Sequence, residues 1–459
     1  MSPRSAQDRG REGSTMTEIN GADTAWLLAS TAMVVVMTFG LATFYGGMVR
    51  AKNVMNTMMM VVATIAVLTV VWFGWGYSLI FGGDNGGVIG NFSYVGMTDA
   101  MDEVSGTVPT LLFATFQLTF ALITCGLVCG SIVDRARFSA WCVFIVAWAT
   151  FVYAPMAHWI FFFGSDTDEP GWMVDFGVLD FAGGTVVEIN SGASGLALAL
   201  VIGVRMGWKR DPMRPHNLTM VMLGAGLLWF GWFGFNAGSA LSANAQAALV
   251  LCNTMIAGAV AICGWMVVER IRDKSFTSFG AASGAVSGLV AITPSCAAVT
   301  PIGAAAIGAA AIGFLAGAIC ALAIAWKYKL GYDDSLDVVG VHFVGGVVGM
   351  IGIGLFASAQ ATGILTADDP TDGIDGLFYG GGLDQLGKQL VGVGAATLYA
   401  FAVTFIIGWV IHKTMGFRAD PEAELSGLDQ AMHAETAYEL GATVSSTGRM
   451  AGSSSADGA

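Results

Sequence analysis

Charge is scarce in this sequence. Only 12% of its 459 residues are Asp, Glu, Lys or Arg, whereas a soluble protein usually carries about 25%. Because 55% of the residues are hydrophobic, the chain lacks the charge that a water-exposed surface of this size needs. Proline is also sparse, with 10 residues, while glycine is frequent, with 63, and small residues let helices pack closely in membranes. The composition therefore predicts an integral protein of the lipid bilayer.

Basic residues and catalytic motifs are missing as well. The formal net charge is −13, which excludes nucleic-acid binding, since that needs a basic surface. No HExxH, GxSxG or Cys/His cluster occurs, which argues against an intramembrane enzyme, although His158 and Glu188 would be the pair to consider for one. The seven cysteines all fall in or beside apolar stretches. We interpret them as small core residues and expect no disulfide, no metal site and no cofactor.

Long hydrophobic runs dominate what remains. A spanning helix needs about 20 mostly apolar residues, and eleven runs approach this length: 25–48, 55–81, 109–132, 138–162, 181–204, 217–239, 245–268, 279–296, 303–326, 337–358 and 389–412. The sequence thus predicts an all-α integral membrane protein with eleven transmembrane helices. Residues 1–23 would be a polar leader, 24–415 the membrane domain, and 416–459 a cytoplasmic tail that is disordered at its end.

The loops between these runs alternate in charge, which predicts the orientation. Alternate loops are basic: Arg50 and Lys52; Arg135 and Arg137; Arg205, Lys209, Arg210 and Arg214; Arg270, Arg272 and Lys274; Lys327 and Lys329; Lys413 and Arg418. The intervening loops are acidic: Asp84, Asp99, Asp102 and Glu103; Asp166, Asp168, Glu169 and Asp175; Asp368, Asp369, Asp372 and Asp375. Since Lys and Arg collect on the cytoplasmic side, we expect a multi-pass protein of the cell membrane with its N-terminus outside and its C-terminus inside. Three arginines of the leader oppose this rule, and Met16 is an alternative start.

Two of the predicted helices begin alike. Asp180 is followed eight residues later by Glu188, and Asp334 eight residues later by His342, each before a glycine-rich stretch. The two helices run in opposite directions, which is the pattern of an inverted repeat of five plus five helices with one extra. Eight helical residues rise about 12 Å into a core about 30 Å thick, so Glu188 and His342 can meet near the midplane. Ionisable residues there are usually functional; a tether between helices is the alternative.

A family resemblance rests first on residues 180–205, which read DFAGGTVVEINSGASGLALALVIGVR and resemble the signature segment of the Amt/Mep/Rh ammonium transporter family. Five other segments resemble the family as well: FYGGMVRAKN (44–53), FQLTFALIT (116–124), RPHNL (214–218), GWFGFNAGSA (231–240) and GVHFVGGVVG (340–349). The resemblance implies a homotrimer with one pore per subunit. Ammonium, or methylammonium, would be captured in an outer vestibule and deprotonated. Ammonia would then cross an apolar channel, while the proton follows two central ionisable side chains.

The matching motifs imply two groups of site residues. An outer recognition site would contain Phe116, Phe120, Phe161, Trp159, Ser239 and Asp180, and the pore would contain Glu188, His342, Phe235 and Trp232. Phe120 and Phe235 resemble the stacked gate rings, and Ser239 would offer its hydroxyl oxygen to the cation. Aromatic faces plus one oxygen suit a small cation, and an apolar lumen rejects charged ions because they must lose water. The plainer alternatives are that the phenylalanines and Ser239 only pack and that Asp180 only caps its helix.

The sequence departs from the family pattern at two positions. The first central residue is His in many relatives and Glu188 here, which resembles a variant in some fungal members. The family also often shows Ala-His-x-x-Trp before the fifth helix, where this chain reads AHWIF, with Phe161 at the Trp position and Trp159 two residues earlier. A Phe face binds a cation less strongly than Trp, so recruitment would be weaker unless Trp159 compensates.

The tail leaves a regulatory role open. Residues 416–438 read GFRADPEAELSGLDQAMHAETAY and resemble the family's cytoplasmic C-terminal region, where a PII-type signalling protein is implied to dock; a solvated amphipathic tail is the alternative. Two other functions share the fold. One is an ammonium sensor, which a large C-terminal signalling domain would favour, and the tail here is too short for such a domain. The other is an Rh-type channel for ammonia or carbon dioxide, although residues 231–240 and the tail resemble the microbial ammonium branch more closely.

Overall fold

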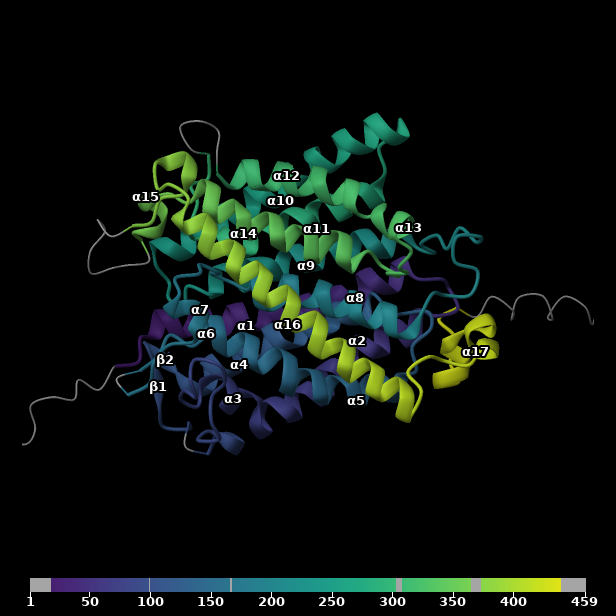
Figure 1. The fold of residues 1–459 in the computed structure, drawn as a ribbon, viewed down its shortest axis with the longest axis horizontal. Helices are drawn as coiled ribbons and strands as arrows, with labels where there is room; N and C mark the ends of the chain where they lie inside the picture. Colours follow the sequence, from purple (N-terminus) through teal and green to yellow (C-terminus); the bar gives the residue numbers. More distant parts are fainter. Residues whose placement is uncertain (1–17, 99, 166, 303–307, 365–372, 439–459) are drawn as a thin grey trace, which may run out of the picture.

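The protein is almost wholly helical in the computed structural model, which describes residues 18–98, 100–165, 167–302, 308–364 and 373–438. Long helices run side by side along one axis of the molecule (Figure 1). One end of the bundle carries α7 (Trp172–Asp175), α15 (Ala359–Thr362) and the two-residue strands β1 (Val104–Ser105) and β2 (Val108–Pro109), which pair antiparallel. The other end carries α13 (Trp326–Leu330) and α17 (Pro421–Ser426). We call these the α7 end and the α17 end.

Ten helical segments within the described residues are long and apolar enough to cross a membrane. They are α1 (Gly21–Met48); α2 (Val54–Val71) with η1 (Trp72–Gly76) and α3 (Tyr77–Phe81); α4 (Thr110–Cys129); α5 (Phe138–Trp148) with η3 (Ala149–Tyr153) and α6 (Ala154–Phe161); η4 (Gly184–Ile189) with α8 (Asn190–Ile202); α9 (Leu218–Gly238); α10 (Ala245–Asp273); α12 (Ala309–Ala323) with α13; η5 (Val339–Phe343) with α14 (Val344–Phe356); and α16 (Asp384–Thr414). Each coincides with a run predicted from the sequence.

The remaining predicted span, 279–296, forms α11 (Ser278–Ser295), which is almost entirely buried. It has the length of a span, but its Gly, Ser and Thr residues keep its hydropathy below that of the other ten. The short elements are η2 (Val95–Met97), η6 (Leu377–Tyr379) and η7 (Asp429–His433). Most of the polar leader, the end of the tail and several acidic loop residues (1–17, 99, 166, 303–307, 365–372 and 439–459) lie outside the described residues.

The helices that carry the two central residues begin in the same way. Asp180 accepts hydrogen bonds from the backbone N–H groups of Gly183 (2.9 Å) and Gly184 (2.6 Å), and Asp334 accepts one from Val339 (2.8 Å). Each aspartate therefore caps the start of its helix. In both cases the first turn is a π-helix, η4 or η5, and an α-helix follows. The first helix runs from the α7 end to the α17 end and the second runs back, so the two are antiparallel.

Glycines allow α1 and α9 to pack closely along an extensive contact. A Cβ atom on Gly231 of α9 would lie 2.3 Å from Cβ of Met37, and one on Gly224 would lie 2.4 Å from the backbone nitrogen of Phe44. Such distances are below van der Waals contact, so only glycine permits this approach. The cysteines follow the core prediction in part: Cys252 and Cys263 of α10 are exposed, so that prediction is wrong for these two.

Candidate functional site

Four phenylalanines from three helices meet towards the α7 end. Phe116 and Phe120 lie one turn apart on α4, with ring centroids 5.0 Å apart. Phe235 of α9 stacks on Phe120 at 4.1 Å with an interplanar angle of 21°. Phe161, at the end of α6, meets Phe120 edge to face at 6.2 Å. Three of the rings are buried and Phe161 is half-buried. The stack of Phe120 on Phe235 thus fills the centre of the bundle, with Phe116 and Phe161 beside it.

Ser239 lies at the end of α9, next to these rings. Its hydroxyl donates a hydrogen bond to the backbone oxygen of Phe235 at 2.9 Å. The preceding Gly238 packs so tightly on Phe116 that a Cβ there would lie 2.9 Å from its Cε2 atom. Because the hydroxyl proton of Ser239 is already used, the lone pairs on its oxygen remain available to accept from another N–H group.

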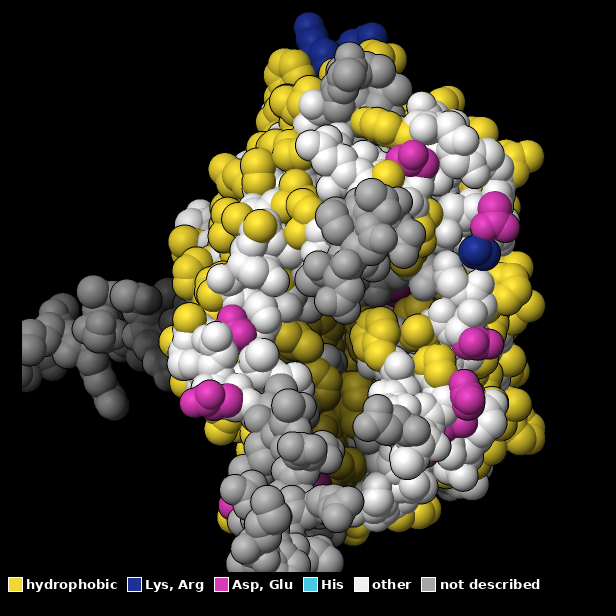
Figure 2. Space-filling view, turned by 90° about the vertical axis from the view of Figure 1, so that its left-hand side faces the viewer, with side chains coloured by type: hydrophobic (Ala, Val, Ile, Leu, Met, Phe, Trp, Pro, Cys, Tyr) yellow, Lys and Arg dark blue, Asp and Glu magenta, His cyan; other side chains and the backbone are white. Residues whose placement is uncertain are grey.

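Figure 2 shows the α7 end of the molecule. Ser239 and Phe161 are both half-buried. Hydrophobic side chains line a recess in the middle of this face, and the charged side chains around it are mostly acidic (Figure 2). A recess with apolar walls and an acidic rim attracts cations electrostatically.

Trp232 continues the path beyond the phenylalanine stack. Its ring lies 6.0 Å from that of Phe235, and its indole N–H donates to the hydroxyl of Thr293 at 2.8 Å. That hydrogen bond satisfies the buried indole nitrogen and fixes the ring. Trp232, Glu188 and His342 line one cavity of about 10 Å³, whose other walls are apolar: Met37, Leu41, Phe44, Tyr45, Ile123, Leu127, Val187, Leu228 and Val286.

Glu188 and His342, which both line this cavity, contact each other directly. Nδ1 of His342 lies 2.7 Å from Oε2 of Glu188, and the two residues are only 5% and 1% exposed. The residues come from the π-helical turns η5 and η4, and π turns inside helices are often found at functional sites. Gly346 lies against this pair, since a Cβ on it would be 2.9 Å from Cβ of Glu188. A carboxyl and an imidazole at this distance can share and exchange a single proton.

Two further cavities lead from His342 to the α17 end. The second, of about 20 Å³, shares Phe44, Tyr45, Val286 and His342 with the first. The third, of about 450 Å³, shares Met48, Phe279, Leu336 and Asp337 with the second. A cavity needs roughly 10–15 Å³ to hold one water, so the first two have room for about one small molecule and not for a hydrated ion. The third opens widely at the α17 end.

The sequence missed the residues of this inner path. Tyr45 borders both small cavities, and its hydroxyl donates to the backbone oxygen of Leu127 at 3.2 Å. Phe44 and Tyr45 belong to the FYGGMVRAKN segment, which carried the family resemblance but was assigned no role. Asp337 lies only five residues before His342, but the pattern singled out Asp334 and assigned Asp337 no role.

Two predicted outer-site residues act differently from the rest. The carboxylate of Asp180 is occupied by the backbone N–H groups at the start of η4, so it shapes the helix that carries Glu188. Trp159 packs away from the phenylalanines: its ring meets those of Tyr399 (4.7 Å) and Trp172 (5.6 Å), and its indole N–H donates to Val88. These contacts lie apart from the phenylalanine stack, and the recognition role of Trp159 stays a prediction.

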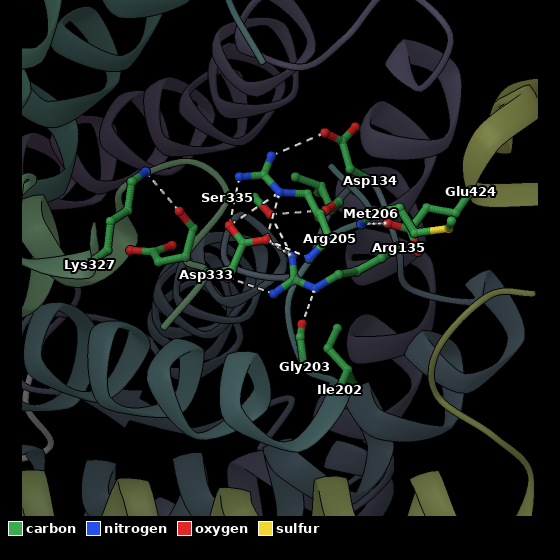
Figure 3. A network of polar contacts seen from close by, with 12 residues as sticks. Asp134, Arg135, Ile202, Gly203, Arg205, Met206, Lys327, Asp333, Ser335 and Glu424 are labelled. Carbon is green, nitrogen blue, oxygen red and sulfur yellow. Dashed lines mark hydrogen bonds and ion pairs between the residues drawn. The ribbon is translucent and has the colours of Figure 1, made fainter. Parts of the chain in front are cut away.

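Buried ion pairs lie at the α17 end and form what we call the inner-face network: Asp134, Arg135, Arg205, Asp333, Ser335 and Glu424 (Figure 3). Arg205 binds Asp333 through two nitrogens, at 2.7 Å and 2.9 Å, and reaches Asp134 at 3.2 Å. Arg135 donates to Ser335 (2.7 Å) and to the backbone oxygen of Asp333 (2.6 Å). The network joins the loop after α4, the loop after α8 and the loop before η5.

The charges of this network perturb one another. Burial raises the pKa of Asp333, but the hydrogen bonds from Arg205 and the positive charges of Arg135 and Arg205 lower it more, so it lies below its ordinary value. Burial lowers the pKa of Arg135 to about 10, although the carboxylate of Asp333 opposes this. Both side chains therefore remain charged at neutral pH.

The C-terminal segment is bound to the same network. Glu424 of α17 accepts from the backbone N–H of Met206 (2.5 Å) and from Arg418 (2.7 Å). The backbone N–H of Arg137 donates to Phe417 at 2.9 Å. Asp429 accepts a hydrogen bond from the backbone N–H of Asn56 (2.8 Å) in the first turn of α2. Asn53, the residue before this helix, provides no side-chain cap. The segment thus caps a membrane helix as well as binding the loops.

Comparison with known proteins gives the family. A family model described as the Ammonium Transporter Family matches residues 25–438. An ammonium transporter of Mycobacterium tuberculosis (strain ATCC 25618 / H37Rv) is 48% identical, with 92% of this chain and 91% of that protein covered. One of Bacillus subtilis (strain 168) is 42% identical, with 91% and 98% covered.

Solved structures agree in fold. Saccharomyces cerevisiae Mep2 superposes with a TM-score of 0.79 at 34% identity, over 88% of this chain and 89% of that chain. A protein named Sensor Amt Protein superposes with a TM-score of 0.80 at 28% identity, over 90% and 98%. The ten apolar helices and these matches agree on a multi-pass membrane protein. The chain belongs to the ammonium transporter family, whose members are transporters and not enzymes.

Proposed function

We propose that the chain recruits ammonium at an outer aromatic site, deprotonates it, and conducts ammonia through a hydrophobic pore while the proton crosses by the Glu188–His342 pair. The observation that carries this proposal is the succession from the phenylalanine stack to Trp232, whose ring lies next to Phe235, and then to the cavity that Trp232 shares with that pair. The series continues through two small cavities to the α17 end. This succession of residues supports a single path through the subunit.

The outer site suits a small cation. Phe116, Phe120 and Phe161 present ring faces and edges beside the free lone pairs of Ser239. A cation over a ring face gains roughly 0.5–2 kcal/mol, and an accepting oxygen adds direction. Phe120 and Phe235 then block the way at 4.1 Å. A charged ion would have to shed its water to pass, which is costly, whereas neutral ammonia loses little.

The buried pair supplies a route for the charge. One proton can reside on Glu188, with His342 neutral, or on His342, with Glu188 ionised, and the 2.7 Å contact lets it move between them. Two imidazoles could do the same, so the change from His to Glu in this chain preserves proton transfer. A carboxylate in this place also tolerates a cation better than an imidazole does.

We further propose eleven spans in an inverted five-plus-five arrangement plus one helix, with α11 as the eleventh. The α17 end would face the cytoplasm, because the basic loops around Arg135 and Arg205 gather there. The N-terminus would then be outside the cell membrane. A homotrimer follows from the family resemblance. Chemical crosslinking of the purified protein and accessibility of single introduced cysteines from each side test these proposals.

A PII-type signalling protein is the proposed regulatory partner at the α17 end. The segment from Phe417 to His433 binds the loops at that end of the molecule, at Arg137 and Met206, and the start of α2 at Asn56. Removing residues from 416 onward should abolish inhibition and recruitment of such a protein during an ammonium upshift. If the full-length chain never co-purifies with a PII protein under these conditions, the partner is wrong.

The main proposal is tested in proteoliposomes. Ammonium added outside should evoke a current that changes with pH, together with methylammonium uptake. Uptake without any current would still support ammonia conduction but would contradict proton transfer through the pair. Tight ammonium binding with negligible uptake would instead favour a sensor, the function named for one similar structure. Equal permeability to carbon dioxide would favour an Rh-type gas channel.

A further inference from the structure

His158 belongs to the AHWIF segment but has no place in the transport path described above. It lies on α6, three residues before Phe161, and its side chain is fully buried. Residues that are three positions apart on a helix are neighbours on its surface. The contacts of His158 therefore bear directly on the position of the Phe161 ring.

Both ring nitrogens of His158 face hydrogen-bond acceptors. Nδ1 lies 2.6 Å from the backbone oxygen of Ile80, which can only accept. Nε2 lies 3.1 Å from Oδ1 of Asp84. That oxygen also accepts from the backbone N–H of Gly87 at 2.6 Å, so the proton between the two side chains belongs on Nε2. His158 thus donates from both nitrogens, as an imidazolium does, and forms a buried ion pair with Asp84.

His158 also holds the end of α6. Its ring stacks on that of Phe162, with the centroids 4.7 Å apart and an interplanar angle of 16°. Phe162 is the residue at which the helix ends, and its N–H donates to the backbone oxygen of His158 at 3.3 Å. A Cβ atom on Gly171 would lie 2.1 Å from that oxygen, so the next loop packs directly on this turn. Phe161 therefore sits on a turn that His158 holds through both its ring and its backbone.

The bonds of His158 also set α6 relative to α4. Both of its partners lie in α3 or in the loop after it, next to α6 (Figure 1). The ring of Phe81 on α3 meets that of Phe113 on α4 edge to face at 5.0 Å. α4 also carries Phe120, which the ring of Phe161 contacts at 6.2 Å. The distance between these two rings thus depends on how firmly α6 is bound to α3.

We propose that His158 is a positioning residue of the outer recognition site, and that its ion pair with Asp84 makes ammonium recruitment depend on the external pH. While His158 is protonated, the pair keeps Phe161 beside Phe120. When Nε2 loses its proton, its lone pair faces the carboxylate oxygen and the two repel each other. The last turn of α6 is then released from the loop after α3, and recruitment weakens. The side chain of Asp84 is 11% exposed, so water can exchange protons with the pair.

Few other groups can titrate near this pair. The elements that pack on α6 are α3, η3, α7 and η4, and they carry Tyr77, Tyr153, Asp175 and Glu188. Asp168 accepts from the backbone N–H of Asp84 at 3.2 Å. Among the described residues, Asp84 is the charged side chain that is hydrogen-bonded to the ring of His158. A change in protonation at His158 therefore acts first on its bond to Asp84.

This inference rests on the proposed outer site, and its test is the external KM for methylammonium in right-side-out vesicles. The pH is equal on both sides and is varied from about 5 to 8, where histidines change charge. The wild-type KM should rise about tenfold towards alkaline pH, the effect of losing one charged hydrogen bond, with kcat changed much less. His158→Gln cannot titrate, so its KM should be high at every pH.

Asp84→Asn removes the opposite charge and should give the same raised, pH-independent KM. It carries the test by itself if a lowered Tm in detergent shows that His158→Gln is badly folded. His412→Gln is the matched control, because His412 lies in the last turn of α16 at the other end of the molecule, and it should keep the wild-type profile. A wild-type KM that does not change with pH, or an equal change in His158→Gln, would overturn the proposal.

A second measurement asks whether His158 acts through Phe161. In a Phe161→Ala background, His158→Gln should raise the KM no further, because residues that act through one contact are not additive. A full further rise would show that His158 acts elsewhere. If Phe161→Ala itself keeps the wild-type KM, the proposed outer site is wrong. If Phe161→Ala raises the KM and His158→Gln does not, only the positioning role is lost.

Discussion

Oε2 of Glu188 and Nδ1 of His342 are 2.7 Å apart, and each comes from the π-helical first turn of one of two antiparallel helices. Eight residues before each ionisable residue, an aspartate caps the start of the helix. The two halves of the bundle therefore place their ionisable residues symmetrically. The chemistry is not symmetric, because one half supplies a carboxyl group and the other an imidazole. Replacements of Glu188 can therefore separate proton transfer from packing.

Glu188→Gln should reduce the ammonium-evoked current most. The amide keeps the shape of the side chain but cannot titrate, and loss of a proton-transfer group typically costs about a hundredfold or more in rate. Glu188→His should keep the current, because two imidazoles can pass a proton, and should discriminate better against potassium than the wild type does. Current and potassium permeability are measured in liposomes. Equal currents and selectivity in all three proteins would reduce Glu188 to a tether between helices.

The phenylalanine stack should control which ions pass. Phe120→Ala or Phe235→Ala removes one of two rings that lie 4.1 Å apart, and a lost aromatic face weakens cation binding by about 1–2 kcal/mol. We expect methylammonium uptake to fall about tenfold or potassium to leak through. Phe401→Ala is a suitable control, since it breaks a stacked pair with Phe405 on α16, away from the path. Wild-type uptake and selectivity in both gate variants would refute the gate.

Much of this architecture could be predicted because it depends on local properties. Hydropathy alone gave each of the ten long segments, and the matched spacing of Asp180 with Glu188 and of Asp334 with His342 predicted where the two ionisable residues would lie. A helix rises by a fixed amount per residue, so equal spacing from opposite faces leads to one depth. Tertiary packing was not needed for that step.

The sequence was less informative where the direction of a side chain around its helix, or packing between distant segments, decides the outcome. Trp159 and Phe161 are two residues apart, which is about 200° around a helix, so only one of them can face Phe120, and the structure places Phe161 there. Asp337 and Tyr45 became visible only when cavities joined α1, α11 and η5. Cys252 and Cys263 are exposed because α10 turns one face outward, which a hydrophobic run does not reveal.

Phe161→Trp should strengthen ammonium recruitment. The larger indole face binds a cation better than a phenyl ring by up to about 1 kcal/mol, which corresponds to a fall in KM of roughly fivefold. The residue is half-buried at the end of α6, so a larger ring there is not confined by a fully buried site. The measurement is the external KM for methylammonium uptake. Trp159→Phe should leave it unchanged, because Trp159 packs on Tyr399 instead; a rise in KM for that control would return Trp159 to the site.

The inner-face network should stabilise the fold in a pH-dependent way. Asp333→Asn leaves the buried guanidinium groups of Arg205 and Arg135 without their carboxylate, and breaking a buried ion pair costs about 3–5 kcal/mol. We expect a lower Tm in detergent at neutral pH and easier proteolysis of the C-terminal segment. Asp420→Asn is the control, because its ion pair with Arg137 is exposed and such pairs contribute about 0–1 kcal/mol.

The pH dependence follows from the direction of the pKa shift. The pKa of Asp333 is lower in the folded protein than its ordinary value of about 4, so the unfolded state binds protons more readily and folding favours the ionised carboxyl. Its contribution to stability is therefore complete above about pH 4 and is lost as the pH falls through the lowered pKa. The Tm of the wild type should fall steeply below pH 4, and that of Asp333→Asn less steeply, starting from a lower value. Parallel Tm curves for the two proteins across this range would show that Asp333 carries no folding-linked charge.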